Sequence, residues 1–567
     1  MTGHNNNACD RLAWAAYWLL FLIATQYFQH NLGGAGLQLS YNNTVWVGAI
    51  LVIAVGAFSA IHHGQWRVPR SGWQYGALIL ALFLPMLWTS TGIELPIGRL
   101  LGVLGGIAFL LALAQCFKAQ RDEKWLLYVL VALGACQAVL GALQLYGFEW
   151  LPIGIPSGFK FRPSGIFQQP NVFASFIVTA MAAAIYLLAK HKVPEHSLHK
   201  LLWLAPLYAV LAFGGFCTYI VMSRTGVLAL IGSLLLLLAM HKKFSSSLAA
   251  GIGLLIAGEV AGALFTEGLG GGFRGTEAAT SSSWRIENWT VSWHIFKDHW
   301  LFGAGLGSFE LVFSEYRAEL YATTGLMSLH NVDHPHNELL FWAAEGGLLP
   351  VLGILVFSVA FIWRLTKLGN QGWGYAAMLF PMALHAMTEY PFYHSAIHWL
   401  TFLVILFLVE ARVGMKEVPV AMPYLAKSLA VMVLLAGTAF FASNLHTISK
   451  LVEVVRQNEV AKAGDSPLLP LLDIVNPVVF DEHISHIVMF AKFQNALKVG
   501  DGQALREFIS WGWEYSRTRP RAQTYLAMLD AARALRDKDE YNRILAKGQW
   551  LYPNNERLQA LRPVNEQ

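Results

Sequence analysis

The hydrophobic positions of the chain form long, nearly continuous runs separated by short polar segments. A helix of about 20 apolar residues crosses the roughly 30 Å hydrocarbon layer of a bilayer. The pattern indicates an all-α polytopic membrane protein. We predict thirteen membrane-spanning helices, near residues 11–29, 44–62, 73–90, 97–117, 125–146, 171–190, 201–221, 225–240, 246–265, 338–363, 373–389, 396–411 and 423–444.

The composition agrees with this fold class. Hydrophobic residues make up 55% of the chain and charged residues 13%, whereas soluble domains carry roughly 25% charged residues. The first span has no small-residue cleavage site after it, so we expect it to remain in the protein. The net charge of +5 is spread over many loops and indicates no nucleic-acid partner, and the four cysteines predict no disulfide framework.

The basic residues show which side of the membrane each loop occupies. Most of them fall in alternate loops: Arg67, Arg70, Lys118, Arg121, Lys124, Lys190, Lys192, Lys200, Lys242, Lys243, Arg364, Lys367, Arg412 and Lys416. The positive-inside rule makes these loops cytoplasmic. The C-terminus and the long loop at 266–337 are then expected outside, where Arg99, Arg162 and Arg224 stand against the rule and need a reason.

The last part of the chain has the composition of a soluble protein. Segments 501–515, 521–536 and 539–550 have apolar residues at helical spacing and are joined by short polar turns. They are similar to tetratricopeptide-like helix hairpins. We therefore divide the chain into a membrane domain at 1–444 and a C-terminal helical domain at 445–567, which either contacts another protein or forms a cap without a partner.

Arg224 interrupts the apolar run from Leu201 to Met240, which is too long for one span. A two-helix hairpin that turns at residues 222–226 accounts for this length. An arginine near the surface of the hydrocarbon layer is a functional candidate. The alternative is that its side chain extends to lipid phosphates.

The long outer loop contains a tryptophan-rich segment from Trp284 to Trp300 with helical spacing, which suits a helix in the headgroup layer. Arg285, Asn288 and Trp289 share one face of it. Arg285 either anchors the helix to lipid headgroups or binds a diphosphate. The glycines of Phe302–Phe309 follow no strand, so we interpret them as a tight turn and not as a nucleotide-binding loop.

The run DHPHNE closes this loop directly before a span. Its residues are Asp333, His334, Pro335, His336, Asn337 and Glu338. In one interpretation, a histidine acts as a general base near its ordinary pKa of about 6.5. In a second, Asp333, His334 and His336 bind a metal. In a third, the histidines only cap the following helix.

Two further groups of polar residues lie at the outer ends of spans. FRPSGIFQQPN places Arg162, Gln168, Gln169 and Asn171 at the start of the sixth span, and HAMTEYPFYH places His385, Glu389, Tyr390 and His394 at the end of the eleventh. Glu259, midway along the ninth span, has no evident function; we expect it to be buried and hydrogen-bonded.

The order of these motifs resembles the O-antigen ligase superfamily, and within it the PglL-type bacterial O-linked protein oligosaccharyltransferases. The motifs are R-P-S-G-x-F-x-Q-P-N, the S-R-T-G hairpin, W-R-x-x-x-W, G-x-G-x-F and H-x-H-N-E. They cover about residues 150–415. The resemblance implies a GT-C-like glycosyltransferase in the bacterial inner membrane, with its active site facing the periplasm.

The resemblance also implies a reaction and a set of residues. A glycan would move as a whole from undecaprenyl diphosphate to Ser or Thr hydroxyls of a pilin-like acceptor protein, with no cofactor and no metal. His336 would be the base, with His334 as its less certain neighbour. Arg224, Arg285 and Arg162 would hold the diphosphate. The remaining residues would line the site: Gln168, Gln169, Asn171, Asn337, Glu338, Glu389 and Tyr390.

Other functions stay open at this point. Related enzymes use a lipid A–core sugar or another repeat unit as acceptor; the long soluble tail favours a protein acceptor. A transporter or lipid flippase would also have many spans, but transporters place ionisable residues near the bilayer midplane. Here only Glu259 lies deep in a span, and the other candidates gather at one face.

Overall fold

A computed structural model of the chain describes residues 2–90, 92, 94–145, 162–240, 245–268, 275–325, 332–460 and 468–564. Several sequence features lie outside these residues. They are the end of the fifth predicted span at residue 146, Phe161, Lys242, Lys243, most of the glycine run after Gly268 and the side chains of Ser281 and Ser282.

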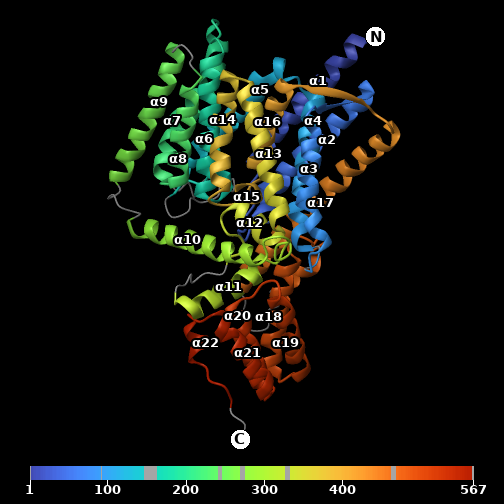
Figure 1. The fold of residues 1–567 in the computed structure, drawn as a ribbon, viewed down its shortest axis with the longest axis vertical. Helices are drawn as coiled ribbons and strands as arrows, with labels where there is room; N and C mark the ends of the chain where they lie inside the picture. The colour runs from blue at the N-terminus through green and yellow to red at the C-terminus, as the bar shows by residue number, and fades with distance from the viewer. Residues whose placement is uncertain are drawn as a thin grey trace. The chain divides into compact units, whose positions relative to one another are not determined.

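The described residues form helices almost throughout (Figure 1). The helices are α1 (Thr2–Trp18), α2 (Ser40–His63), α3 (Gly72–Phe83), α4 (Glu94–Cys116), α5 (Ala119–Gln144), α6 (Pro170–Lys190), α7 (Ser197–Val221), α8 (Arg224–Leu238), α9 (Ser246–Gly268), α10 (Gly275–Asp298), α11 (Phe309–Thr324), α12 (Glu338–Gly346), α13 (Leu348–Lys367), α14 (Asn370–Ala386), α15 (Pro391–His394), α16 (Ala396–Val413), α17 (Pro423–Val460), α18 (Asp481–Val499), α19 (Gly502–Ser516), α20 (Ala522–Ala534), α21 (Lys538–Leu551) and α22 (Glu556–Ala560). Two strands, β1 (Gln65–Pro69) and β2 (Met415–Pro419), complete the fold.

The chain divides into two compact units. Unit 1 contains Met1–Gly76, Leu101–Phe273 and Val356–Asn476, and unit 2 contains Ala77–Leu100, Arg274–Leu355 and Pro477–Gln567. The predicted boundary at residue 444 falls inside α17.

The prediction of a helical polytopic membrane protein is confirmed. Among the described residues, ten helical segments are long and apolar enough to cross a bilayer, and two shorter apolar ones occur at Gly72–Leu87 and Arg224–Leu238. The span predicted at 373–389 corresponds to the 17-residue helix α14. The count of thirteen spans stays a prediction.

The predicted span at 338–363 is wrong at its beginning. Gly347 ends α12 with φ 74° and ψ −153°, and the apolar helix begins only at Leu348. A Cβ atom at Gly347 would lie 2.5 Å from the carbonyl oxygen of Leu301, so no other residue fits this position without rearrangement. The histidine-bearing segment therefore leads into a separate helix of nine residues.

The pairing of β1 with β2 was not predicted from the sequence. The strands are antiparallel, with Gln65 opposite Pro419 and Pro69 opposite Met415. They belong to two loops that the basic residues predict to be cytoplasmic. Because backbone hydrogen bonds join these loops directly, both lie on the same side of the membrane, as the positive-inside rule requires.

Helix α6 is the centre of unit 1. Every residue from Val172 to Leu188 is buried, and α5, α7, α8, α9 and α14 pack around it. The neighbouring helices α7 and α9 lie side by side (Figure 1). A Cβ at Gly258 of α9 would lie 2.1 Å from the carbonyl oxygen of Ala212, so glycine permits this close approach. Between the two helices, Thr218 donates a hydrogen bond to Glu259 over 2.7 Å.

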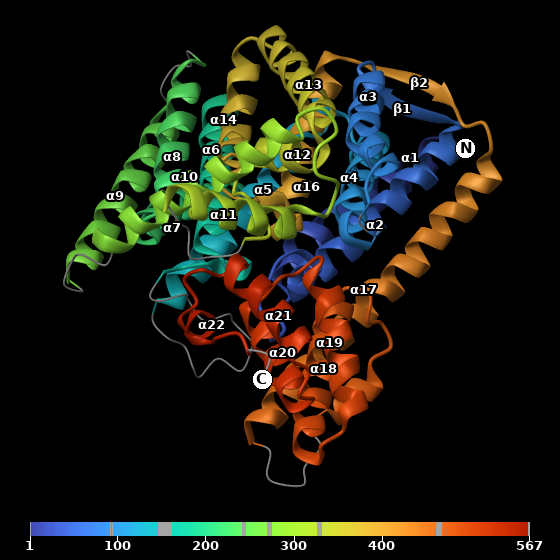
Figure 2. The ribbon, with the colours of Figure 1, turned by 60° about the horizontal axis from the view of Figure 1, so that its bottom comes forward.

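Unit 2 combines the helices of the long loop at 266–337 with the C-terminal helices. Helix α10 packs on α11 and α12 (Figure 2). Val291 and Ile295 of α10 belong to the buried apolar cluster of these helices. Helices α18 to α21 pack in chain order around a core of their own. The buried Glu310 of α11 forms ion pairs with Arg519 and Arg521, which precede α20. The three helices that the sequence predicts in the tail correspond to α19, α20 and α21.

Candidate functional site

The turn between α7 and α8 presents Arg224 as the first residue of α8. Met222 adopts a left-handed conformation with φ 49°, and Ser223 caps α8 by accepting a hydrogen bond from Gly226 N over 3.2 Å. The predicted helical hairpin is therefore confirmed. Arg224 is exposed, and the partial positive charge of the helix N-terminus adds to its attraction for an anion.

Arg162 contacts the same turn from the polar segment before α6. Its Nε atom donates a hydrogen bond to the carbonyl oxygen of Val221, the last residue of α7, over 2.9 Å. Arg162 is partly buried. The structure thus brings two of the predicted arginines, Arg162 and Arg224, to one helix turn.

Glu389 is held by two amide side chains at the N-terminus of α6. Gln169 Nε2 donates to one carboxylate oxygen over 2.9 Å, and Asn171 Nδ2 donates to the other over 2.7 Å. Gln169 also caps α6, since its Oε1 atom accepts from Val172 N over 2.7 Å. Hydrogen bonds to a charged carboxylate are roughly twice as strong as neutral ones. Three residues from two separate sequence motifs therefore form one group.

Buried polar residues support this group from within unit 1. His385 Nε2 lies 3.5 Å from Glu389, and His385 Nδ1 lies 2.7 Å from Ser175 Oγ. Ser175 Oγ is in turn 3.2 Å from His398 Nε2. Sequence reasoning did not single out Ser175 or His398, because both lie inside apolar spans. Only the spacing of Ser175 four residues after Asn171, on the same face of α6, could have pointed to it.

His394 and two further predicted residues lie close to the same segments. His394 is buried and its Nε2 atom lies 2.8 Å from the carbonyl oxygen of Phe167. Burial lowers the pKa of His394, so the ring is neutral near pH 7 and donates this hydrogen bond. Tyr390 precedes α15 and is partly buried, and Gln168 adopts a left-handed conformation with φ 58°.

In unit 2, the segment from His334 to Glu338 has a defined geometry at the start of α12. Asn337 caps the helix, since its Oδ1 atom accepts from Leu340 N over 3.0 Å. The hypothesis that the histidines cap this helix is therefore wrong. His334 instead accepts a hydrogen bond from the backbone N–H of His336 through Nδ1, over 2.9 Å.

The two histidines differ in their surroundings. His334 is 5% exposed, and because its Nδ1 atom is an acceptor, a neutral ring carries its proton on Nε2, 4.0 Å from Glu338. His336 has φ 58°. This left-handed conformation is uncommon for residues other than glycine, and strain of this kind gathers at functional sites.

Arg285 lies on α10 and is partly buried, and the nearby Asn288 is 3% exposed. The prediction that the tryptophan-rich segment is helical is confirmed. Its position in the headgroup layer and the role of Arg285 stay predictions.

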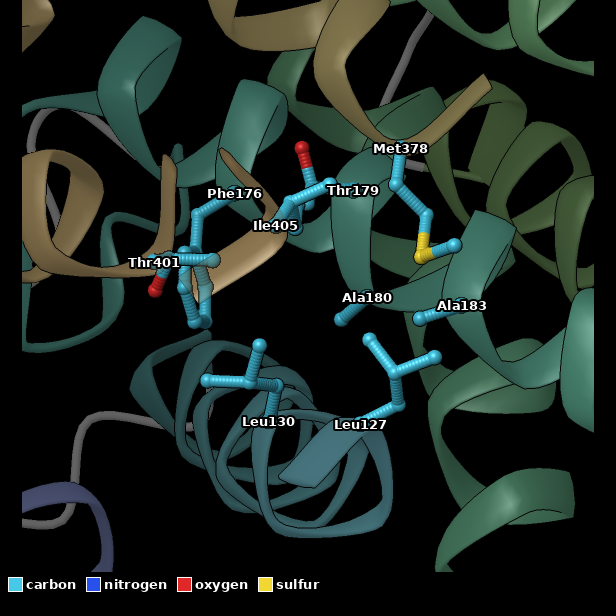
Figure 3. A pocket seen from close by; sticks show the side chains of 9 residues that line it. All are labelled: Leu127, Leu130, Phe176, Thr179, Ala180, Ala183, Met378, Thr401 and Ile405. Carbon is cyan, nitrogen blue, oxygen red and sulfur yellow. The ribbon is translucent and has the colours of Figure 1, made fainter. Parts of the chain in front are cut away.

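A small internal cavity of unit 1 does not form a site. A cavity of about 10 Å³ lies among α5, α6, α14 and α16 (Figure 3), which is room for about one water molecule. It is lined almost entirely by apolar side chains, with Thr179 and Thr401 as the exceptions. In the part of the chain that the structure describes, no three His, Cys, Asp or Glu side chains gather as metal ligands.

Three family models match parts of the chain. A protein glycosylation ligase model matches residues 163–188, an O-antigen ligase model matches 207–358, and a model of the C-terminal part of virulence factor membrane-bound polymerases matches 373–564. No curated protein matches the chain.

The matched regions contain the groups described above. The first matched region includes Gln169 and Asn171. The second includes Arg224, Arg285, His334 and His336. The third includes Glu389. The matches indicate a membrane enzyme that transfers a glycan from a lipid-linked donor to a protein or lipid acceptor, or polymerises it. They confirm the resemblance of the chain to the O-antigen ligase superfamily, with similarity to PglL-type protein glycosylation ligases.

Proposed function

We propose that the protein transfers a whole glycan from undecaprenyl diphosphate to Ser or Thr hydroxyls of periplasmic, pilin-like proteins, with His336 as general base. The observation that carries this proposal is the strained backbone of His336, at φ 58°, directly before a capped helix. A left-handed conformation costs about 1–3 kcal/mol for such a residue. A function for its side chain explains why the chain retains it.

In the proposed reaction, the acceptor hydroxyl oxygen forms a bond to the anomeric carbon while His336 takes its proton. The bond from that carbon to the phosphate oxygen breaks, and its electron pair stays with the diphosphate. A positioned base of this kind contributes roughly 10²–10⁴-fold in rate. The second histidine, His334, is the less suitable base because its Nδ1 atom already accepts a backbone hydrogen bond.

The diphosphate leaves with negative charge and needs a cationic partner more than a proton. We assign this role to Arg224, Arg285 and Arg162. Guanidinium groups match phosphate oxygens in two-point contacts, and fixed cations act strongly on charge that develops in a water-poor site. The arginines supply the positive charge for which other transferases use a metal ion. Glu389, held by Gln169 and Asn171, suits recognition of sugar hydroxyls.

Polymerisation of repeat units is the second candidate function. It is favoured by the match of residues 373–564 to the polymerase model. Because this match includes the C-terminal helices, the tail alone does not select a protein acceptor. In polymerisation the attacking hydroxyl belongs to a sugar, and the roles of the histidine and the arginines are the same.

An acceptor comparison tests the proposal. Purified protein is incubated with undecaprenyl diphosphate glycan and a pilin-like protein, with lipid A–core, or without an added acceptor, each with and without EDTA. We expect the mass of the pilin-like protein to increase by one whole glycan, with or without EDTA. Growth of the lipid-linked glycan alone would support the polymerase, and transfer only to lipid A–core would support an O-antigen ligase. No transfer in any mixture would contradict the proposal.

The periplasmic orientation has a separate test. In a cysteine-free variant, we introduce single cysteines at the exposed positions Ala322, Asn554 and Ser197. An impermeant thiol reagent should label positions 322 and 554 in intact spheroplasts, but not position 197. The opposite labelling would place the candidate site in the cytoplasm.

A further inference from the structure

Arg99, in α4, is an arginine on the side of the membrane where the positive-inside rule predicts few. Its side chain is only 8% exposed and forms an ion pair of 2.5 Å with Glu345, which is 2% exposed. The guanidinium carbon lies 4.5 Å from the ring centroid of Phe341 and 4.3 Å from that of Trp342. Arg99 is thus fixed by one carboxylate and two aromatic rings, all on α12.

Glu345 also binds the glycine-rich loop at 302–309. One of its carboxylate oxygens accepts hydrogen bonds from Gly307 N over 3.0 Å and from Phe309 N over 3.2 Å. Clustered backbone N–H groups commonly bind an anion. Here the bound anion is the carboxylate of Glu345 itself. This carboxylate links the loop at 302–309 and Arg99 to the end of α12.

The two aromatic rings that contact Arg99 lead to the histidine segment. The ring of Phe341 lies 4.5 Å, centroid to centroid, from that of His334. Trp342 Nε1 donates to one carboxylate oxygen of Glu338 over 2.7 Å, and the other oxygen lies 4.0 Å from His334 Nε2. Because α12 has only nine residues, Glu345 is about two turns of helix from Glu338, and Glu338 and Phe341 lie beside His334.

We propose that Arg99 and Glu345 are positioning residues that hold the segment from His334 to Glu338 in its reactive conformation. The proposal rests on the proposed function, in which this segment supplies the base. A misplacement of about 1 Å in a reactive group can cost roughly 100-fold in rate. Loss of the ion pair therefore lowers the rate of transfer more than it lowers donor binding.

Unit 1 contains a matched pair for comparison. Arg364 lies 3.0 Å from Glu410, with side-chain exposures of 4% and 1%. Its guanidinium carbon lies 5.8 Å from the ring centroid of Phe357 and 5.5 Å from that of Phe361. Both pairs are buried and stacked on two aromatic rings. The difference lies in the partners: among the described residues, the second pair is bonded to Ser71, Gln74 and Tyr75, and none of these is a predicted site residue.

The test compares Arg99→Lys with Arg364→Lys in the purified full-length protein. Lysine keeps the charge but loses the planar fork and the stacking. Two quantities are measured: kcat and KM for transfer, and the rate at which diethylpyrocarbonate modifies His334, followed by mass spectrometry. For Arg99→Lys we expect a fall in kcat of roughly 10- to 100-fold, a nearly unchanged KM for the donor, and faster modification of the buried His334.

Arg364→Lys should leave kcat and the modification rate close to those of the parent. Two more variants show whether a loss of activity comes from misfolding or from the lost contacts. Glu345→Gln keeps the hydrogen bonds to the loop and removes the ion pair, and Trp342→Phe keeps the aromatic ring and removes the bond to Glu338. Both should lower kcat in the same direction as Arg99→Lys, with unchanged melting temperatures or with losses no larger than that of Arg364→Lys.

Parent-like modification of His334 in Arg99→Lys would overturn the proposal, as would equal effects of the two lysine variants. The modification assay needs no activity. If the parent transfers no glycan but His334 becomes reactive only in the Arg99, Glu345 and Trp342 variants, the positioning role stands and the proposed function fails. If transfer occurs and all variants match the parent, the proposed function stands and the positioning role fails.

Discussion

Each unit contains a histidine whose ring lies within 4.0 Å of the carboxylate of a glutamate four residues later, and these two pairs have different surroundings. His385 lies in the last turn of α14, and Glu389 follows the end of this helix, with Glu389 N bonded to the carbonyl of His385 over 2.8 Å. His334 lies before α12, and Glu338 is the first residue of α12. The strained His336 lies between them. The same spacing therefore produces a relaxed group in one unit and a strained segment in the other.

The comparison indicates which of the two groups is the better candidate for the proton transfer. Glu389 receives two amide donors, and His385 contacts Ser175, so this group is a fixed and largely buried polar cluster. Around His336, a backbone N–H is bonded to the neighbouring histidine side chain instead of to the helix. A residue held in such a conformation is a candidate for a functional role. Gln168, Met222 and Arg536 also have positive φ, but none of their side chains suits a general base. We therefore assign the proton transfer to the strained segment and substrate recognition to the relaxed group.

The largest expected effect separates the two histidines of the strained segment. His336→Ala should lower transfer by roughly 10²–10⁴-fold because it removes the base. His334→Ala removes only the side chain that bonds His336 N, so it should lower transfer less. The measurement is initial transfer rate at equal amounts of inserted protein. Equal and full activity of both variants would leave the base unassigned.

The arginines give the next largest effect. Arg285→Lys keeps the positive charge but cannot make the two-point contact with phosphate. We expect transfer to fall by roughly 100-fold, the cost of losing one fixed donor to developing charge, with weaker donor binding. Transfer rate and donor binding are measured together. Near-normal transfer by the lysine variant would return Arg285 to the role of an anchor for lipid headgroups.

A smaller effect is expected in the relaxed group. Glu389→Gln removes the charge that accepts from Gln169 and Asn171. Hydrogen bonds to charged groups contribute about 1.5–3 kcal/mol, so loss of this charge should raise KM for the glycan by about 10-fold while kcat changes less. Glu410→Gln, at another buried carboxylate of unit 1, is the control and should change stability only. A fall in kcat to the level of His336→Ala would contradict the division between the two groups.

The sequence predicts the helical elements and the local geometry well, because both depend on nearby residues. The turn at Met222, the turn glycines of 302–309 and the helices of the tail correspond to the patterns that predicted them. The family resemblance rests on the order of such local motifs and is confirmed by the three matches.

Contacts between distant parts of the chain could not be predicted in the same way. Asn171 and Glu389 are 218 residues apart, and Arg99 and Glu345 are 246 apart. Periodicity reports which face of a helix is apolar, but not which helix faces it. The break at Gly347 was missed although Gly346 precedes it and Pro350 follows it, because the apolar residues around them were interpreted as one span. The constraint on Gly347 comes from the backbone of Leu301.

The roles of the candidate residues stay predictions, and one substitution tests the central one most directly. His336→Gly removes the side chain and also relieves the left-handed strain, since glycine adopts φ near 58° without penalty. If strain is retained for catalysis, this variant should be more stable than the parent by about 1 kcal/mol while losing transfer as fully as His336→Ala. Unfolding stability and transfer rate are measured on the same preparation. A glycine variant that transfers glycan at the parent rate would contradict the account.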